Sequence, residues 1–159
     1  MADLEQLTKM VNELRDIDAL TQLMARYCHL VDARRWNDLA ALFTEDATCD
    51  YGFFGSFKGR DEIMSKFFAP LDQAVSFMAH MVHNPLVEVQ GDTASGSWYL
   101  TAQTTLEPIK QAVWVMGSYQ NRFKRVSGTW KITAVNFTFW YYSRYEQGWA
   151  KEKIWEIPR

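Results

Sequence analysis

The sequence of 159 residues has no excess of basic residues: 17 Lys and Arg stand against 19 Asp and Glu, a formal net charge of −2. Nucleic-acid-binding domains usually carry a basic patch, so we expect no nucleic-acid partner. No apolar run reaches the ~20 residues of a membrane-spanning helix. The N-terminal stretch MADLEQLTKMVNELRDID lacks the basic start and apolar middle of a signal peptide. These absences predict a cytoplasmic protein with no membrane partner.

Metal-binding and nucleophile motifs are also missing. The two cysteines, Cys28 and Cys49, have no CxxC or metal-ligand spacing, so free thiols are expected, with Cys28 as a small core residue. His80 and His83 are three residues apart in a segment predicted to be extended, where they face opposite sides. Gly-x-Ser-x-Gly and glycine-rich phosphate loops are absent. We therefore expect neither a metal nor a cofactor.

The sequence is rich in apolar residues, 48% in all and 15% aromatic, which is ample for one core. The N-terminal third has helical spacing. Leucines and a valine predict an amphipathic helix over residues 3–13, separate from or continuous with the next. Leu20, Met24, Tyr27 and Val31 follow at steps of four, three and four, which predicts a core-facing stripe. A break is expected at residues 32–35, then a short helix, and a further helix over 61–68.

From Val75 onward the apolar period changes to two, which predicts strands. Strands are expected before the turn at 90–92 and over the segments 94–106, 111–126 and 130–142, with a short one at 47–51. Ser127-Gly128 is a hairpin turn. Helices followed by long antiparallel strands indicate an α+β fold. A curved sheet whose open side is closed by helices would enclose a pocket.

Asp32 lies beside the apolar stripe and has two interpretations. It is either the N-cap of a helix beginning near residue 34 or a functional acid. In the second case Asp32 and His80 would form a dyad that acts as a general base near pH 7, and Tyr27 could donate to a carbonyl oxygen. On an ideal helix Tyr27 and Asp32 are about 140° apart, so they share a cavity only if it wraps the helix end or the helix opens there. The alternative for His80 is a structural hydrogen bond.

Apolar and aromatic residues are candidates for the walls of the pocket. An aromatic cluster over residues 137–142 could line a cavity, or could be plain core and oligomer interface. Arg144, at a sheet end, could pair with a ligand carboxylate or an internal acid. His83 competes with His80 for the inward position. The expected substrate-binding residues are thus His83, Phe53, Phe54, Met78, Trp98, Trp114, Phe139 and Arg144.

Three stretches carry a family resemblance: RYCHLVDARRWNDLAALFTEDATCDYG, HMVHNPLVEVQGDTASGSWYL and SYQNRFKRVSGTWKITAVNFTFWYYSR, with FKGRDEI after the first. In sequence and in order, these stretches resemble those of SnoaL-like proteins of the nuclear transport factor 2-like superfamily. Within it the sequence is most similar to scytalone dehydratase and the bile acid 7α-dehydratase group. The length suits one domain, so we expect a single SnoaL-like domain over residues 1–159, of which the resemblance covers residues 16–144. Its fold would be a cone-shaped, mostly antiparallel α+β barrel around N-terminal helices.

The resemblance also implies a reaction. The dehydratases remove a proton next to a carbonyl or enone and expel water, with no cofactor or metal. Their tyrosine, aspartate and histidine match Tyr27, Asp32 and His80. We therefore expect a lyase or isomerase acting on a hydrophobic, ring-containing small molecule of steroid or polyketide type. The alternatives are a non-catalytic binding module and the small subunit of a ring-hydroxylating dioxygenase. Aromatics on both faces of the strands predict a homo-oligomer, a dimer or a trimer.

Overall fold

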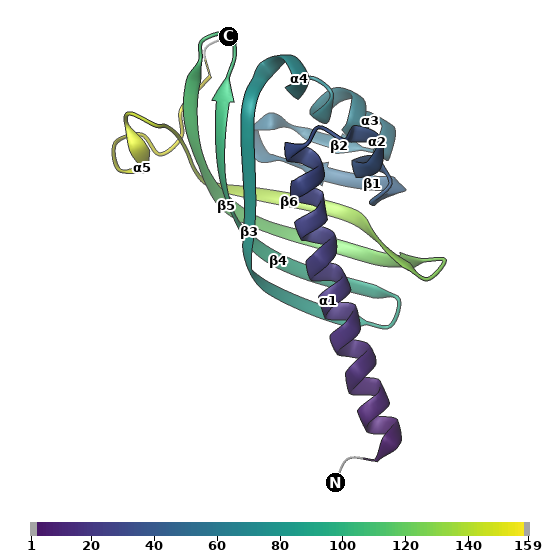
Figure 1. Cartoon of the computed structure of the whole chain (residues 1–159). Coiled ribbons are helices and arrows are strands. Elements are labelled where there is room, and N and C mark those ends of the chain that lie inside the picture. Colours follow the sequence, from purple (N-terminus) through teal and green to yellow (C-terminus); the bar gives the residue numbers. More distant parts are fainter. Residues whose placement is uncertain (1–2, 158–159) are drawn as a thin grey trace.

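A long helix packed against a strongly curved sheet dominates the computed structural model, which describes residues 3–157 (Figure 1). Asp3 caps the N-terminus of helix α1 (Leu4–Asp32), and its side chain accepts a hydrogen bond from the Gln6 N–H at 2.8 Å. The two helices expected before residue 32 are thus one continuous helix. The predicted break follows, and the short helix α2 (Trp36–Ala40) comes next.

One six-stranded sheet contains all the strands among the described residues. Its order is β2-β1-β6-β5-β4-β3, and only the β1–β6 pair is parallel. The predicted α+β fold with a curved, mostly antiparallel sheet is confirmed, although the sheet does not close. The strands are β1 (Phe43–Asp50), β2 (Ser56–Lys58), β3 (Val75–Gln90), β4 (Thr93–Leu106), β5 (Gln111–Val126) and β6 (Thr129–Arg144).

Short helical segments close one end of the sheet. After the 3-10 turn η1 (Gly52–Phe54), the chain forms α3 (Arg60–Glu62), the π-helical turn η2 (Ile63–Phe68) and α4 (Leu71–Ala74). The predicted helix over 61–68 therefore exists, but most of it is π-helical. The Ala69 N–H donates to the Met64 carbonyl at 2.9 Å, five residues back. A last short helix, α5 (Gly148–Lys151), lies in the C-terminal tail.

Burial alternates along β4 and β5, as expected for strands that cover a core. Ala94, Trp98 and Leu100 on β4 are buried, as are Val113 and Tyr119 on β5. Gly96 leaves room for the Trp98 ring, because a Cβ at this glycine would lie 2.3 Å from a ring carbon. The core thus fills the space between α1 and the concave face of the sheet.

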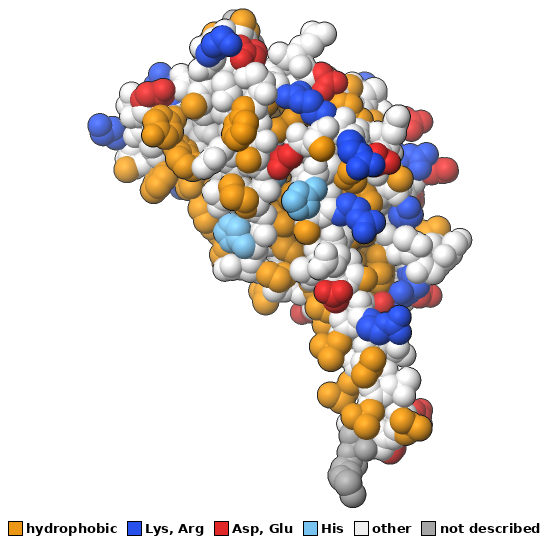
Figure 2. All heavy atoms as spheres, in the orientation of Figure 1, with side chains coloured by type: hydrophobic (Ala, Val, Ile, Leu, Met, Phe, Trp, Pro, Cys, Tyr) orange, Lys and Arg blue, Asp and Glu red, His pale blue; other side chains and the backbone are white. Residues whose placement is uncertain are grey.

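The first turns of α1 extend beyond the rest of the molecule (Figure 1). The predicted amphipathic helix forms there, but Leu4, Leu7, Val11 and Leu14 are all exposed. Figure 2 shows hydrophobic side chains along this projecting arm. Among residues 3–157, no helix is both long and apolar enough to cross a membrane.

Candidate active site

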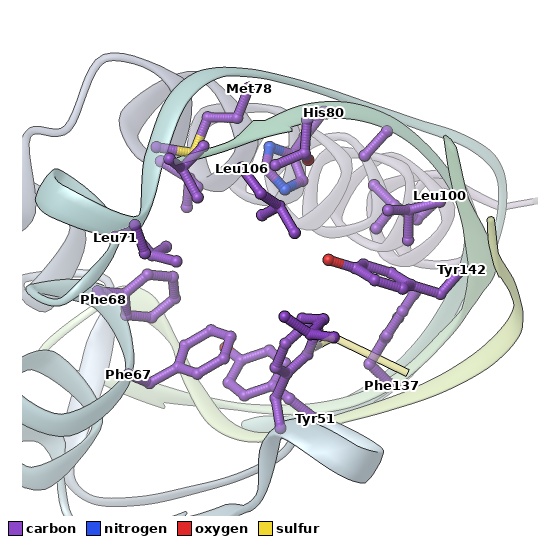
Figure 3. Close-up of a pocket in the computed structure, with 18 of the residues that line it drawn as sticks. Tyr51, Phe67, Phe68, Leu71, Met78, His80, Leu100, Leu106, Phe137 and Tyr142 are labelled. Atoms are coloured by element: carbon purple, nitrogen blue, oxygen red, sulfur yellow. The ribbon is translucent and has the colours of Figure 1, made fainter. Parts of the chain in front are cut away.

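A cavity of about 320 Å³ opens between α1, the concave face of the sheet and the η2–α4 segment (Figure 3). Its walls are mainly aromatic and aliphatic. Leu100 and Phe137 come from the sheet, while Phe67, Phe68 and Leu71 come from the helical segment. The Phe67 ring stacks on Tyr51 at a centroid distance of 3.9 Å. Polar groups reach the cavity at only a few places, so these determine what it can recognise.

One polar position is the Asp32–His80 pair. His80 Nδ1 lies 2.6 Å from Asp32 Oδ1, and the His80 backbone N–H donates to Asp32 Oδ2 at 3.0 Å. A carboxylate at Nδ1 makes that nitrogen the protonated one, so Nε2 carries the lone pair. The His80 side chain lines the cavity, while Asp32 lies behind it. Their side chains are only 19% and 26% exposed, so water competes weakly for this hydrogen bond.

The end of α1 brings these two residues together. Asp32 is the last residue of α1, and Arg34 follows with a φ of +55° that turns the chain away. The Arg34 guanidinium donates to the carbonyl oxygens of Leu71 and Val75. This arginine therefore ties the end of α1 to the start of β3, the strand that carries His80.

The interpretation of Asp32 as a helix N-cap is wrong. The residue at the N-cap of α2 is Arg35, which makes no side-chain capping bond. Both carboxylate oxygens of Asp32 accept hydrogen bonds from His80 instead. Tyr27 and Asp32 lie on different faces of α1, yet both are connected to the same cavity. Tyr27 lines it directly, whereas Asp32 bonds to His80, whose ring β3 brings to the cavity wall.

A buried tyrosine cluster forms another polar position. The hydroxyls of Tyr27 and Tyr51 share a hydrogen bond of 3.0 Å, and the Tyr119 ring meets Tyr27 edge-on at 6.1 Å. All three residues line the cavity. Burial is the main cause that raises the pKa of each phenol well above its ordinary value. They are therefore neutral at physiological pH and available as hydrogen-bond donors.

The two thiols are buried near this cluster. Burial, aided by the charge of Asp32, raises the pKa of Cys28 to about 12, and burial raises the pKa of Cys49 to about 12. Thiols in this state are protonated and poor nucleophiles. Within the described ranges, no three side chains of His, Cys, Asp or Glu come together as metal ligands would.

The structure places five of the residues proposed from the sequence on the cavity wall. These are Tyr27, His80, Phe54, Met78 and Phe139. With Asp32 behind His80, the three candidate catalytic residues lie at or next to one cavity.

Five other candidates for substrate binding lie elsewhere. His83 does not line the cavity. Its Nε2 atom forms a hydrogen bond of 3.0 Å with Thr101 Oγ1. Trp98 is only 1% exposed and packs on Phe123 in the core.

The remaining three residues do not line the cavity either. Trp114 stacks on Tyr145, and Phe53 is 51% exposed beside Phe139. Arg144 binds Glu152 with a 2.7 Å ion pair, an internal acid rather than a ligand.

Three tyrosines in the cavity were not singled out as site residues from the sequence. Tyr51 follows β1, and Tyr119 lies on the buried face of β5, which the sequence did not distinguish from the opposite face. Tyr142 belonged to the aromatic cluster over 137–142 without a particular role. Alternation indicates the face of a strand, whereas the position of the cavity along the strand depends on the packing of distant helices.

Comparison with known proteins identifies the family of this chain. The SnoaL-like domain family model matches residues 12–136. The uncharacterized protein Rv2910c of Mycobacterium tuberculosis is 32% identical over 123 residues, which cover 77% of this chain and 84% of that protein.

Solved structures share the fold. A Novosphingobium aromaticivorans protein provisionally named an aromatic ring hydroxylase is 30% identical, with a TM-score of 0.76, covering 82% of this chain and 94% of that one. Another protein from the same species, provisionally named scytalone dehydratase, is 22% identical with a TM-score of 0.78. The match covers 83% of this chain and 89% of that one. The chain therefore belongs to the SnoaL-like family and has the nuclear transport factor 2-like fold.

Proposed function

We propose that this protein is a cofactor-independent lyase, a dehydratase, or an isomerase that acts on a hydrophobic, ring-containing small molecule of steroid or polyketide type. The observation that carries the proposal is the 2.6 Å contact between Asp32 Oδ1 and His80 Nδ1 at the wall of an apolar cavity. The scytalone dehydratase name of one structural neighbour is in keeping with it. The proposal treats the whole chain, residues 1–159, as one domain.

His80 is the proposed general base. Its Nε2 lone pair takes a proton from a carbon next to a substrate carbonyl, and the C–H electron pair moves to form an enolate. Asp32 stabilises the imidazolium that results and holds the ring in one tautomer. Such positioned proton transfer typically contributes 10²- to 10⁴-fold to a rate.

Tyr27 and Tyr51 are the proposed stabilisers of the enolate oxygen. Their shared hydrogen bond leaves one hydroxyl proton free to donate to the substrate. A donor in a cavity with little water stabilises developing charge more strongly than water does. In a dehydration, the C–O bond then breaks, the double bond forms, and the leaving hydroxide takes the proton from His80 as water. In an isomerisation, His80 returns the proton to another carbon.

The shape of the cavity limits the ligand. A volume of about 320 Å³ lies at the lower end of the ~300–1,000 Å³ range for small-molecule pockets. The contiguous rings of Tyr51, Phe67 and Phe68 in the wall favour a flat, ring-containing molecule over a flexible chain. We therefore expect a compact ring system that fills this space.

Two substitutions test the mechanism. Asp32→Asn and His80→Ala should each lower kcat at least 100-fold on a substrate found by screening cyclic β-hydroxy ketones, while the melting temperature changes little. His83→Ala is the matched control, since His83 is a histidine of the same strand outside the cavity lining, and it should retain activity. Full activity in both Asp32→Asn and His80→Ala would exclude this mechanism.

A non-catalytic binding module is the second candidate. The bond of 3.0 Å from the His80 backbone N–H to Asp32 favours it, because it gives Asp32 a purely structural function between α1 and β3. In that case a ligand would bind Asp32→Asn as tightly as the wild type, with no turnover by either protein.

A further inference from the structure

Tyr142 enters the cavity from β6 in a rigidly held position. Its backbone N–H donates to the Lys153 carbonyl at 2.8 Å, and its own carbonyl accepts from the Trp155 N–H at 2.7 Å. The ring packs edge-on against Phe53 and Phe54, with centroid distances of 5.4 and 5.6 Å. A side chain fixed by the tail and by aromatic neighbours presents its hydroxyl at one defined place.

The Tyr142 hydroxyl differs from those of Tyr27 and Tyr51. The latter two are hydrogen-bonded to each other at 3.0 Å. Within residues 3–157 the Tyr142 hydroxyl has no hydrogen-bond partner, although the residue is only 3% exposed. Figure 3 shows its oxygen directed into the open space of the cavity. A hydroxyl that faces the cavity and has no partner in the protein is available to a molecule that enters the cavity.

We propose that Tyr142 is a specificity-determining residue that hydrogen-bonds to a second oxygen atom of the ligand, separate from the one at Tyr27 and Tyr51. The inference rests on the proposed use of this cavity for a small molecule, but not on the chemistry of Asp32 and His80. The ligand class is thereby narrowed to ring systems with two oxygen functions at separated positions.

The chemistry of the group defines what it recognises. A phenol hydroxyl donates one hydrogen bond and accepts others, so a ligand hydroxyl or carbonyl oxygen fits equally. Burial raises the pKa of Tyr142 above its ordinary value, so the group stays neutral and does not act as a charge. Phe53 and Phe54, which pack edge-on against the ring, offer no hydrogen-bonding group, so they do not compete for the Tyr142 hydroxyl.

A pair of probes tests the inference by binding alone. Naphthalene and 2,6-dihydroxynaphthalene share one ring system, and the diol has an oxygen at each end, so one reaches Tyr142 whichever way it enters. We expect the wild type to bind the diol more tightly than naphthalene in a fluorescence titration. Tyr142→Phe should reduce this preference about 3- to 10-fold, the range for one neutral hydrogen bond, and leave naphthalene affinity unchanged.

Tyr141→Phe is the matched control, because this adjacent tyrosine stacks on Trp149 and does not line the cavity. It should keep the full preference. A wild type that does not prefer the diol, or a Tyr142→Phe variant that keeps the preference, overturns the inference. An equal loss in Tyr141→Phe also overturns it. Because no turnover is measured, these results are independent of Asp32→Asn and His80→Ala activities.

Discussion

At the scale of single residues, the hydrogen bond between Tyr27 and Tyr51 links two groups of the proposed oxyanion site. Tyr27→Phe and Tyr51→Phe should each lower kcat about 100-fold, as the loss of one oxyanion donor does in other enzymes, with little change in KM. The double variant should lose no more than roughly the larger single loss, because residues that act as a unit are not additive. Steady-state kinetics of the three variants measure this. Independent, multiplying losses would show that the two hydroxyls act separately.

The buried thiols give a second prediction at this scale. Since burial raises the pKa of Cys28 and Cys49 to about 12, only about one thiol in 10,000 is ionised at pH 8. Both should resist iodoacetamide at pH 8 in the folded protein and react readily in 6 M guanidinium, as mass spectrometry will show. Rapid labelling of either native thiol would contradict the burial seen here.

From the sequence, the candidate catalytic residues could be identified more reliably than the residues that line the cavity. Tyr27 and His80 were proposed from their types and positions, and both face the cavity. Trp98 was proposed for the cavity wall, yet it lies in the core beside Phe123. Leu100, two residues later on the same face, does line the cavity. Alternation cannot distinguish these two because depth along a strand depends on how α1 and η2 pack over it.

At the scale of elements, Asp16 anchors the middle of α1 to the β5–β6 hairpin. Arg125 Nη2 donates to Asp16 Oδ2 at 2.7 Å, and Trp130 Nε1 donates to Oδ1 at 3.1 Å. Burial raises the pKa of Asp16, but these hydrogen bonds and the charge of Arg125 outweigh it and leave the pKa below its ordinary value. The contact is therefore a charge-assisted junction between helix and sheet.

Asp16→Asn should lower the free energy of unfolding by about 1 kcal/mol at pH 7, a value kept small because the groups are partly solvated. A lowered carboxyl pKa stabilises the fold above the unfolded pKa of ~3.9, and the gain disappears as pH falls through the folded value. Urea unfolding should therefore show the difference between variant and wild type shrinking from pH 7 towards pH 3. Asp18→Asn, an exposed position one half-turn away, is the control. An equal loss at both pH values would contradict a contribution from charge.

Element boundaries were predictable where one period persists. The strand predicted over 111–126 agrees with β5, because its alternation runs through sixteen residues. β1 begins at Phe43 rather than Ala47, since its first residues include the polar run 44–46, which resembles a helix end. The parallel pairing of β1 with β6 and the π-helical turn η2 have no local signal. Both arise from packing between segments distant in the sequence.

At the scale of the whole molecule, two apolar surfaces are left uncovered by this chain. One is the outer face of the sheet, where Met81 and Tyr99 are 45% and 40% exposed and Trp140 packs on Tyr99 at 4.7 Å. The other is the projecting arm of α1 with Leu7 and Leu14. Large apolar patches of this kind usually mark interfaces, and a net charge of −2 opposes self-association only weakly. A homo-oligomer, either a dimer or a trimer, therefore remains our prediction.

The outer face of the sheet is the surface we expect a second copy to cover. Sedimentation velocity at about 10 μM should give the mass of two or three chains, since an interface of ~800 Å² per partner is sufficient for a stable complex. Tyr99→Asp places a charge on this face and should shift the protein to a folded monomer, with the circular dichroism spectrum unchanged. Gln90→Asp introduces the same charge at the exposed end of the β3–β4 hairpin and should leave the mass unchanged. A wild-type monomer would refute the oligomer, whereas an oligomeric Tyr99→Asp variant would move the interface to the arm of α1.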